Sequence, residues 1–233
     1  MLPRDRLMVA LDVPSLEHAK ALIAKLGDSV GVYKIGFELL FSGGIALAQE
    51  LAGQGRSVFV DAKLLDIEAT VEHATAAIAR MGAAFLTVHA LDAKTLDAAV
   101  RGRQGSKLKL LGVTVLTNLE RDDLKEQGID RSPLELAIYR AMLAQEAGLD
   151  GVVASAQEAA ALRQALGPHV SIVTPGIRPK GAKAHDQARI MTPAEAIAAG
   201  SDYLVVGRPI TQATDPRAAA EAIVAEIAEA LTG

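Results

Sequence analysis

Residues 58–67 join an apolar run to two carboxylates and one ammonium, those of Asp61, Asp66 and Lys63. Alternate side chains of a β-strand point to the same face, so we expect Asp61 and Lys63 to lie side by side, with Asp66 at the turn that opens the next helix. Neighbouring carboxylates favour the charged form of a lysine. A fixed ammonium can stabilise a developing negative charge and then neutralise it by donating a proton. The pattern therefore predicts acid–base chemistry at the end of this strand.

A structural role for these three charges is the alternative. Asp66 could cap the helix that begins there, and Asp61 and Lys63 could form an ion pair with no catalytic purpose. However, charges of alternating sign beside a buried strand end are costly to remove from water, and this cost favours a functional role.

The composition limits the classes of protein to which the chain can belong. Hydrophobic residues make up 50% of its 233 residues, and the formal net charge is −4. This balance suits a well-filled core and disfavours a nucleic-acid-binding protein, which usually carries a basic stripe. The chain has no cysteine, which excludes disulfides, a thiolate nucleophile and cysteine-bound metals. No apolar run is as long as a membrane span, so we expect a cytoplasmic protein with neither a membrane nor a nucleic-acid partner.

Short strand-like runs alternate with helical segments along the whole chain. Eight such units predict a (β/α)8 TIM barrel that forms a single domain over residues 1–233. An open, doubly wound sheet is the alternative, but no G-x-G-x-x-G motif follows the first expected strand. The expected strands are residues 7–11, 32–35, 58–61, 85–89, 108–116, 151–153, 170–174 and 203–206, and the clearest helices are residues 16–26, 93–101, 134–147, 193–199 and 216–231.

Polar side chains lie at the ends of nearly all the expected strands. In a (β/α)8 barrel, the active site is built from the carboxyl ends of the strands and the loops that follow them. Each polar residue alone has a structural explanation, and His89 is expected to make only a structural hydrogen bond. Together they predict a substrate site at one mouth of the barrel. They are Asp12, Lys34, Asp61, Lys63, His89, Thr117, Arg178 and Arg208.

Two loops near the end of the chain combine glycine with arginine. Gly176 and Arg178 follow the seventh expected strand, and Gly207 and Arg208 follow the eighth. Barrels often bind phosphate with these two loops, because glycine lets backbone N–H groups approach an anion and arginine offers a fork of donors. The pattern predicts a small phosphate ester as substrate. The polar segment 178–190 is expected to close over it as a lid.

Five motifs in chain order carry a family resemblance. The chain resembles the orotidine 5′-monophosphate decarboxylase family in its bacterial, single-domain form, from the first expected strand to the last. Relative to the commonest family pattern, Glu68-Ala69 precede Thr70, and Leu65 replaces a frequent histidine or aromatic residue, which leaves the contacts of that loop open. The motifs are Leu11-Asp12-Val13, Tyr33-Lys34-Ile35-Gly36, Asp61-x-Lys63-x-x-Asp66-Ile67, Thr174-Pro175-Gly176-Ile177-Arg178 and Val206-Gly207-Arg208-Pro209-Ile210.

The resemblance implies decarboxylation of orotidine 5′-monophosphate to uridine 5′-monophosphate, without a cofactor or metal, by a homodimer whose active sites are shared. It implies that Lys63 donates a proton to C6 of the pyrimidine and that Asp61 lies near the departing carboxylate. Asp66, Ile67 and Thr70 would come from the neighbouring subunit. Asp12 and Lys34 would hold the ribose hydroxyls and complete the charge network, so that Lys34 joins Lys63, Asp61 and Asp66 as a catalytic residue. The other implied substrate-binding residues are Thr117 near the pyrimidine, Pro175, and Arg178, Gln187, Gly207 and Arg208 for the phosphate.

Two other functions are compatible with the same barrel. One is a metal-dependent sugar-phosphate decarboxylase, aldolase or epimerase. Such an enzyme would place an acidic ligand on the second strand, where this chain has Lys34, and a second ammonium beside Lys63 opposes a divalent cation. The other is a phosphate-ligand-binding protein without activity. The intact Asp61, Lys63 and Asp66 disfavour that function, because binding alone would not need them.

Overall fold

The computed structural model describes residues 1–179 and 191–232. Eight parallel strands form a closed barrel in which each strand pairs with the next and the last pairs with the first. This confirms the (β/α)8 fold predicted from the sequence. The strands are β1 (Leu7–Ala10), β2 (Val32–Ile35), β3 (Ser57–Leu64), β4 (Phe85–His89), β5 (Lys109–Val113), β6 (Gly151–Val153), β7 (Ser171–Thr174) and β8 (Tyr203–Val206).

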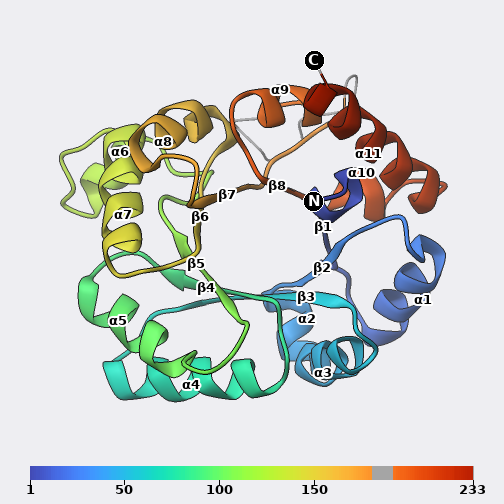
Figure 1. The fold of residues 1–233 in the computed structure, drawn as a ribbon, viewed down its shortest axis with the longest axis horizontal. Helices are drawn as coiled ribbons and strands as arrows, with labels where there is room; N and C mark the ends of the chain where they lie inside the picture. Colours follow the sequence, from blue (N-terminus) through green and yellow to red (C-terminus); the bar gives the residue numbers. More distant parts are fainter. Residues whose placement is uncertain (180–190, 233) are drawn as a thin grey trace.

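Helices surround the ring of strands (Figure 1). Several begin at a side chain that accepts a hydrogen bond from the first helical turn, as Ser15, Asp92, Ser132 and Thr192 do. Within the described part of the chain, no helix is both long enough and apolar enough to cross a membrane. The helices are α1 (Leu16–Leu26), α2 (Phe37–Leu39), α3 (Ile45–Gly53), α4 (Glu68–Arg80), α5 (Ala93–Gly102), α6 (Arg121–Glu126), α7 (Pro133–Glu146), α8 (Ala159–Leu166), α9 (Pro193–Ala198), α10 (Arg208–Thr211) and α11 (Pro216–Thr232), with short turns η1 (Pro3–Arg6), η2 (Leu40–Gly44) and η3 (Ala156–Glu158).

Apolar side chains fill the barrel on both sides of its wall. One large cluster lies between the strands and the helices, and a smaller cluster fills the interior of the ring. In the interior, the ring of Phe85 lies edge-on to those of Phe59 and Tyr203, with centroids 6.1 and 5.3 Å apart. The polar side chains at the carboxyl ends of the strands lie next to this apolar layer, at one mouth of the barrel.

Two strands differ from their predicted bounds by three residues at the carboxyl end, whereas β1 and β7 differ by a single residue. The third strand continues to Leu64 instead of ending at Asp61, because an irregular pairing with β4 lets it carry on past the interior charges. The fifth strand ends at Val113 instead of residue 116. There the carbonyl of Thr114 accepts a hydrogen bond from Arg140 (2.6 Å), and the chain leaves the barrel wall toward Thr117.

Candidate active site

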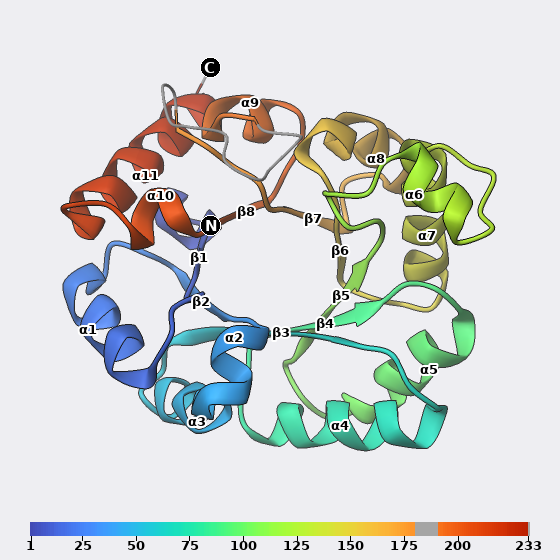
Figure 2. The same ribbon diagram turned by 180° about the vertical axis from the view of Figure 1, so that it is seen from behind.

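The carboxyl ends of the strands enclose a cavity of about 760 Å³. Figure 2 views the barrel from this end, where α2, α6 and α10 lie. The volume of the cavity is typical of a site for a small organic ligand. The predicted site residues that line it are Asp12, Lys34, Asp61, Lys63, Thr117, Pro175, Arg178, Gly207 and Arg208.

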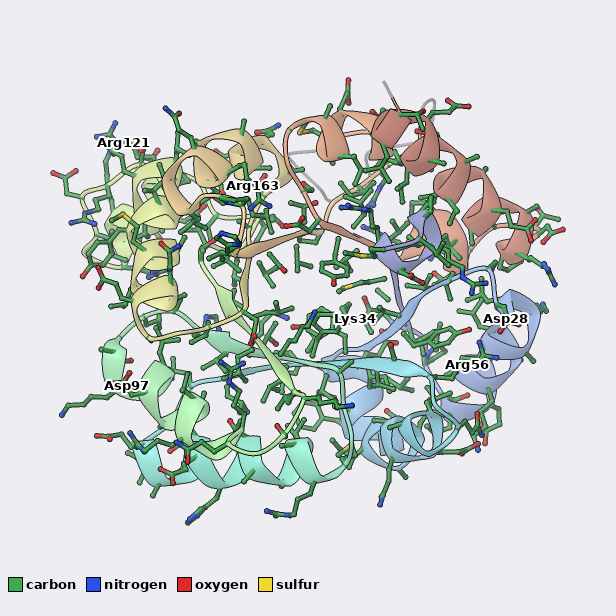
Figure 3. The ribbon with its side chains drawn as sticks, in the orientation of Figure 1. Asp28, Lys34, Arg56, Asp97, Arg121 and Arg163 are labelled. Carbon is green, nitrogen blue, oxygen red and sulfur yellow. The ribbon has the colours of Figure 1, made fainter. Side chains whose placement is uncertain are left out.

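Four charged side chains form a network of alternating sign in this cavity. The Nζ of Lys34 donates hydrogen bonds to Oδ1 of Asp12 (3.2 Å) and Oδ2 of Asp61 (3.3 Å). The Nζ of Lys63 donates to Oδ1 of Asp61 (2.9 Å). In Figure 3, Lys34 lies by the inner ring of strands, unlike charged groups at the outer edge of the molecule. Asp61 therefore holds both ammonium groups on one carboxylate.

Burial and charge act in opposite directions on this network. Burial alone would lower the pKa of Lys34, but the carboxylates of Asp61 and Asp12 outweigh it, and the pKa of Lys34 lies above its ordinary value. Burial alone would raise the pKa of Asp61, but the ammonium groups of Lys34 and Lys63 and the hydroxyl of Thr87 hold it below its ordinary value. Both groups are therefore charged at neutral pH.

Replacing Asp61 by asparagine is expected to lower the free energy of unfolding by about 3 kcal/mol at neutral pH, because it leaves the buried Lys34 with only half of its counter-charge. The folded-state pKa of Asp61 is depressed, so its ionised form stabilises the fold above the unfolded-state pKa. The difference between wild type and Asp61→Asn should therefore shrink as the pH falls below about 4. Urea unfolding between neutral and acidic pH measures this difference. The exposed Asp97→Asn is the control, and an equal effect of both variants would contradict the prediction.

The backbone of β3 is irregular where it carries these charges. Val60 pairs with Leu86 and Leu64 pairs with Val88, so three residues of β3 lie opposite Thr87 alone. Lys63 has a φ of 44°, and it is the only non-glycine among the described residues in the left-handed region. The predicted contact between Asp61 and Lys63 is confirmed. It is produced by a bulge, which redirects side chains, and not by regular strand alternation alone.

Glycine after β2 leaves room for the network. A Cβ at Gly36 would lie 2.8 Å from Nζ of Lys34 and 3.0 Å from Oδ1 of Asp12. Any larger residue would displace the ammonium or the carboxylate. Steric crowding therefore explains why the Tyr33-Lys34-Ile35-Gly36 motif ends in glycine.

The loops after β7 and β8 bring two arginines to the same cavity. Arg178 is buried, with 6% of its surface exposed, and its Nη1 donates to the carbonyl of Ile177 (2.9 Å). Gly176 has a φ of 78°, which glycine adopts without strain. Arg208 opens α10 directly after Gly207. The structure thus brings Arg178, Gly207 and Arg208 to the cavity that the carboxylate–ammonium network also lines.

Asp66, Ile67 and Thr70 are exposed and do not line this cavity. Asp66 and Ile67 instead border a separate hollow beside Asp92 and Lys94. Asp66 Oδ1 accepts a hydrogen bond from the N–H of Ile67 (2.7 Å), and Ile67, not Asp66, is the N-cap residue of α4. Gln187 and most of the predicted lid, residues 180–190, lie outside the described residues.

Several residues near the network were not singled out from the sequence. Glu38, Asn118 and Gln212 line the cavity. Asn118 follows the predicted site residue Thr117, so its place in the loop after β5 could have indicated that it lines the cavity. Thr87 contacts Asp61 from the middle of β4. Threonine is common inside strands, so its position in the sequence alone does not indicate a role in the site.

Burial lowers the pKa of His89, and the ammonium of Lys63 lowers it further, which favours a neutral imidazole at pH 7.

Within the two described ranges, no three histidine, aspartate or glutamate side chains are grouped in a way that could hold a metal ion. The carboxylates of Asp12 and Asp61, which would be the natural oxygen ligands of the cavity, are both engaged by Lys34. An ammonium at that position opposes a divalent cation.

Comparison with known proteins gives a consistent result. Residues 5–223 match the family model described as "Orotidine 5'-phosphate decarboxylase / HUMPS family". A relative from Afipia carboxidovorans named orotidine 5'-phosphate decarboxylase is 56% identical over 228 residues, covering 98% of this chain and 97% of the relative. A Rhodopseudomonas palustris protein of the same name is 56% identical over 227 residues, covering 97% and 95%. The crystal structure of the enzyme of that name from Lactobacillus acidophilus superimposes with a TM-score of 0.84 at 38% identity, covering 95% of this chain and 98% of that chain.

Proposed function

Because the chain belongs to the orotidine 5′-phosphate decarboxylase / HUMPS family, we propose that it converts orotidine 5′-monophosphate to uridine 5′-monophosphate and CO2 in pyrimidine biosynthesis. One observation carries the proposal. An Asp12–Lys34–Asp61–Lys63 network and two arginine loops line a single cavity, so that a nucleotide could place its base beside Lys63 and its phosphate beside the arginines.

The proposed reaction requires a proton donor beside C6 of the pyrimidine. The bond from C6 to the carboxylate breaks, CO2 leaves, and the electron pair remains on C6 in the plane of the ring. Lys63 is suited to stabilise this charge, because its ammonium reaches the cavity while Asp61 holds it in place. It then transfers a proton to C6 and becomes a neutral amine. The position of Asp61 between two ammonium groups suits a carboxylate that must remain ionised near the substrate carboxylate.

The other predicted contacts follow from their places in the cavity. Asp12 and Lys34 lie at the ends of β1 and β2, where they suit the ribose hydroxyls. Thr117 and Pro175 lie in the loops after β5 and β7, beside the space for the base and sugar. Arg178 and Arg208 lie after β7 and β8, where barrels commonly bind phosphate.

Arg208→Ala is expected to raise the KM for orotidine 5′-monophosphate by about 10- to 100-fold, because it removes a charge-assisted, fork-shaped contact to the phosphate. Steady-state kinetics measures the effect. Arg217→Ala is the matched control, because its ion pair with Glu221 lies on the surface of α11. A KM for Arg208→Ala equal to that of the control would remove Arg208 from phosphate binding.

We also propose that the protein acts as a homodimer in which Asp66, Ile67 and Thr70 complete the partner's active site. Large apolar side chains are exposed at the mouth of the barrel after four successive strands. They are Phe37 and Phe41 after β2, Leu65 and Ile67 after β3, Leu91 after β4 and Leu116 after β5. Ile67 is 73% exposed and Phe41 is 86% exposed. Apolar surface exposed in this way is typical of a protein interface, and Leu116 also lines the cavity.

The decisive assay is the loss of ultraviolet absorbance of orotidine 5′-monophosphate with purified protein in excess chelator. Rapid loss with uridine 5′-monophosphate as product is the expected outcome. No loss with a folded protein would overturn the proposal, and turnover of sugar phosphates only after Mg²⁺ is added would favour the metal-dependent function instead. Binding of the nucleotide without turnover would favour a non-catalytic protein.

A cytoplasmic location stays a prediction from the sequence.

A further inference from the structure

Thr87 lies beneath the charged network and is fully buried. It occupies the middle of β4, between Phe85 and His89, and its side chain points to the interior of the barrel. Its hydroxyl donates a hydrogen bond to Oδ1 of Asp61 (2.9 Å). The same hydroxyl accepts a hydrogen bond from the backbone N–H of Lys63 (2.9 Å). One oxygen therefore joins the carboxylate and the backbone of the two central residues of the network.

The hydrogen bond from the Lys63 N–H to the Thr87 hydroxyl replaces a backbone hydrogen bond that is missing between β3 and β4. Because three residues of β3 lie opposite Thr87 alone, the ladder between β3 and β4 is interrupted at Asp61, Ala62 and Lys63. A backbone N–H inside a barrel needs an acceptor, and Lys63 finds it in the Thr87 side chain. Lys63 also has the unfavourable φ of 44°, which persists only where surrounding contacts enforce it.

We infer that Thr87 is a positioning residue whose hydroxyl fixes the bulged backbone of Lys63 and the carboxylate of Asp61 as one unit. The direction of the Lys63 side chain depends on its backbone, and the backbone depends on the Thr87 acceptor. The carboxylate that holds the Lys63 ammonium depends on the Thr87 donor. Both ends of the lysine are thus set by a single hydroxyl, which itself does not line the cavity.

The inference rests on the proposed decarboxylase function and predicts an effect on turnover. Without the hydroxyl, the Lys63 N–H has no acceptor and Asp61 loses one of its donors, so the ammonium can move away from C6. A displacement of about 1 Å costs about 100-fold in rate when a reacting group must be aligned. The phosphate and ribose contacts are made by other strands, so substrate binding should change little.

The test compares kcat and KM for orotidine 5′-monophosphate in Thr87→Val, Thr87→Ser and Thr75→Val. Thr87→Val keeps the shape of the side chain but removes the hydroxyl, and its kcat should fall about 30- to 100-fold while KM changes less than about threefold. Thr87→Ser keeps the hydroxyl and should retain kcat within about threefold of wild type, even though the lost methyl group lowers its melting temperature. Thr75→Val is the matched control, because Thr75 is equally buried and its hydroxyl has no hydrogen-bond partner among the described residues.

The outcomes separate this inference from the proposed function. Absence of turnover in the wild-type protein would overturn the decarboxylase function itself. Normal turnover in wild type together with an unchanged kcat in Thr87→Val would overturn the positioning role alone. A kcat that falls in Thr87→Ser as far as in Thr87→Val would show that packing, not the hydroxyl, matters. If Thr87→Val does not fold, Thr87→Ala replaces it, since it also lacks the hydroxyl and introduces no new bulk.

Discussion

Lys63→Ala should fold as wild type does and lose at least about 10⁴-fold in kcat/KM for orotidine 5′-monophosphate, which corresponds to about 5 kcal/mol of transition-state stabilisation. In the proposed mechanism, the substitution removes both the positive charge beside C6 and the proton that neutralises the carbanion. Removing a positioned group that stabilises the transition state electrostatically, or one that donates a proton, lowers the rate by about 10²-fold or more in each case. Their combined loss makes this one of the largest effects that a single side chain of this protein should have.

The fold should tolerate the loss of Lys63. Its side chain is a quarter exposed (25%), and Asp61 keeps the hydrogen bonds from Lys34 and Thr87 after the ammonium is gone. Thermal unfolding and the affinity for uridine 5′-monophosphate check that the cavity remains intact. Lys63→Arg separates the two contributions, because arginine keeps the charge but does not release a proton near neutral pH.

Lys20→Ala is the matched control for Lys63→Ala. Lys20 also forms an ion pair with a carboxylate, that of Glu50 at 2.7 Å, but on the exposed surface of α1. Its removal should leave kcat/KM unchanged. Near-normal turnover by a folded Lys63→Ala protein would exclude Lys63 as the proton donor, and Lys34, whose ammonium also lines the cavity, would become the next candidate.

The sequence was sufficient to predict the parts of the site that depend on local order along the chain. In a parallel barrel, all strands end at the same mouth, so a polar residue at each strand end is enough to place Asp12, Lys34, Asp61 and Arg208 in one cavity. The two glycine–arginine loops were recognisable because glycine and arginine occur together after both of the strands whose loops often bind phosphate in barrels. The fold followed from the repeated alternation of apolar runs and helical segments.

The bulge in β3 could not be predicted from local order. Its register is set by pairing with β4, which lies more than twenty residues away, and no residue type in the motif demands a positive φ at Lys63. Thr87 was missed for the same reason, because its two bonds exist only after β3 and β4 are side by side. For Asp66 and Ile67, only the family resemblance, which assigns them to the neighbouring subunit, indicated that they are exposed.

Mixing two inactive variants should restore activity if the active site is shared between subunits. Lys63→Ala and Asp66→Asn homodimers should each be nearly inactive, since every site lacks either the proton donor or the partner's carboxylate. In a heterodimer, one site combines Lys63 of the Asp66→Asn subunit with Asp66 of the Lys63→Ala subunit. This site is intact, and the other carries both defects. The exposure of Asp66 outside its own subunit's cavity is the feature that motivates the experiment.

Random exchange at equal concentrations makes half of the dimers heterodimers, each with one intact site out of two, so the recovered activity should approach about one quarter of wild type. Lys63→Ala mixed with Asp61→Asn is the control. Asp61 and Lys63 contact each other within one chain, so no combination of these subunits contains an intact site and no activity should return. Native mass spectrometry verifies that heterodimers form. Heterodimers of Lys63→Ala and Asp66→Asn without activity, or an Asp66→Asn homodimer as active as wild type, would contradict a shared site, because either result removes Asp66 from the partner's cavity.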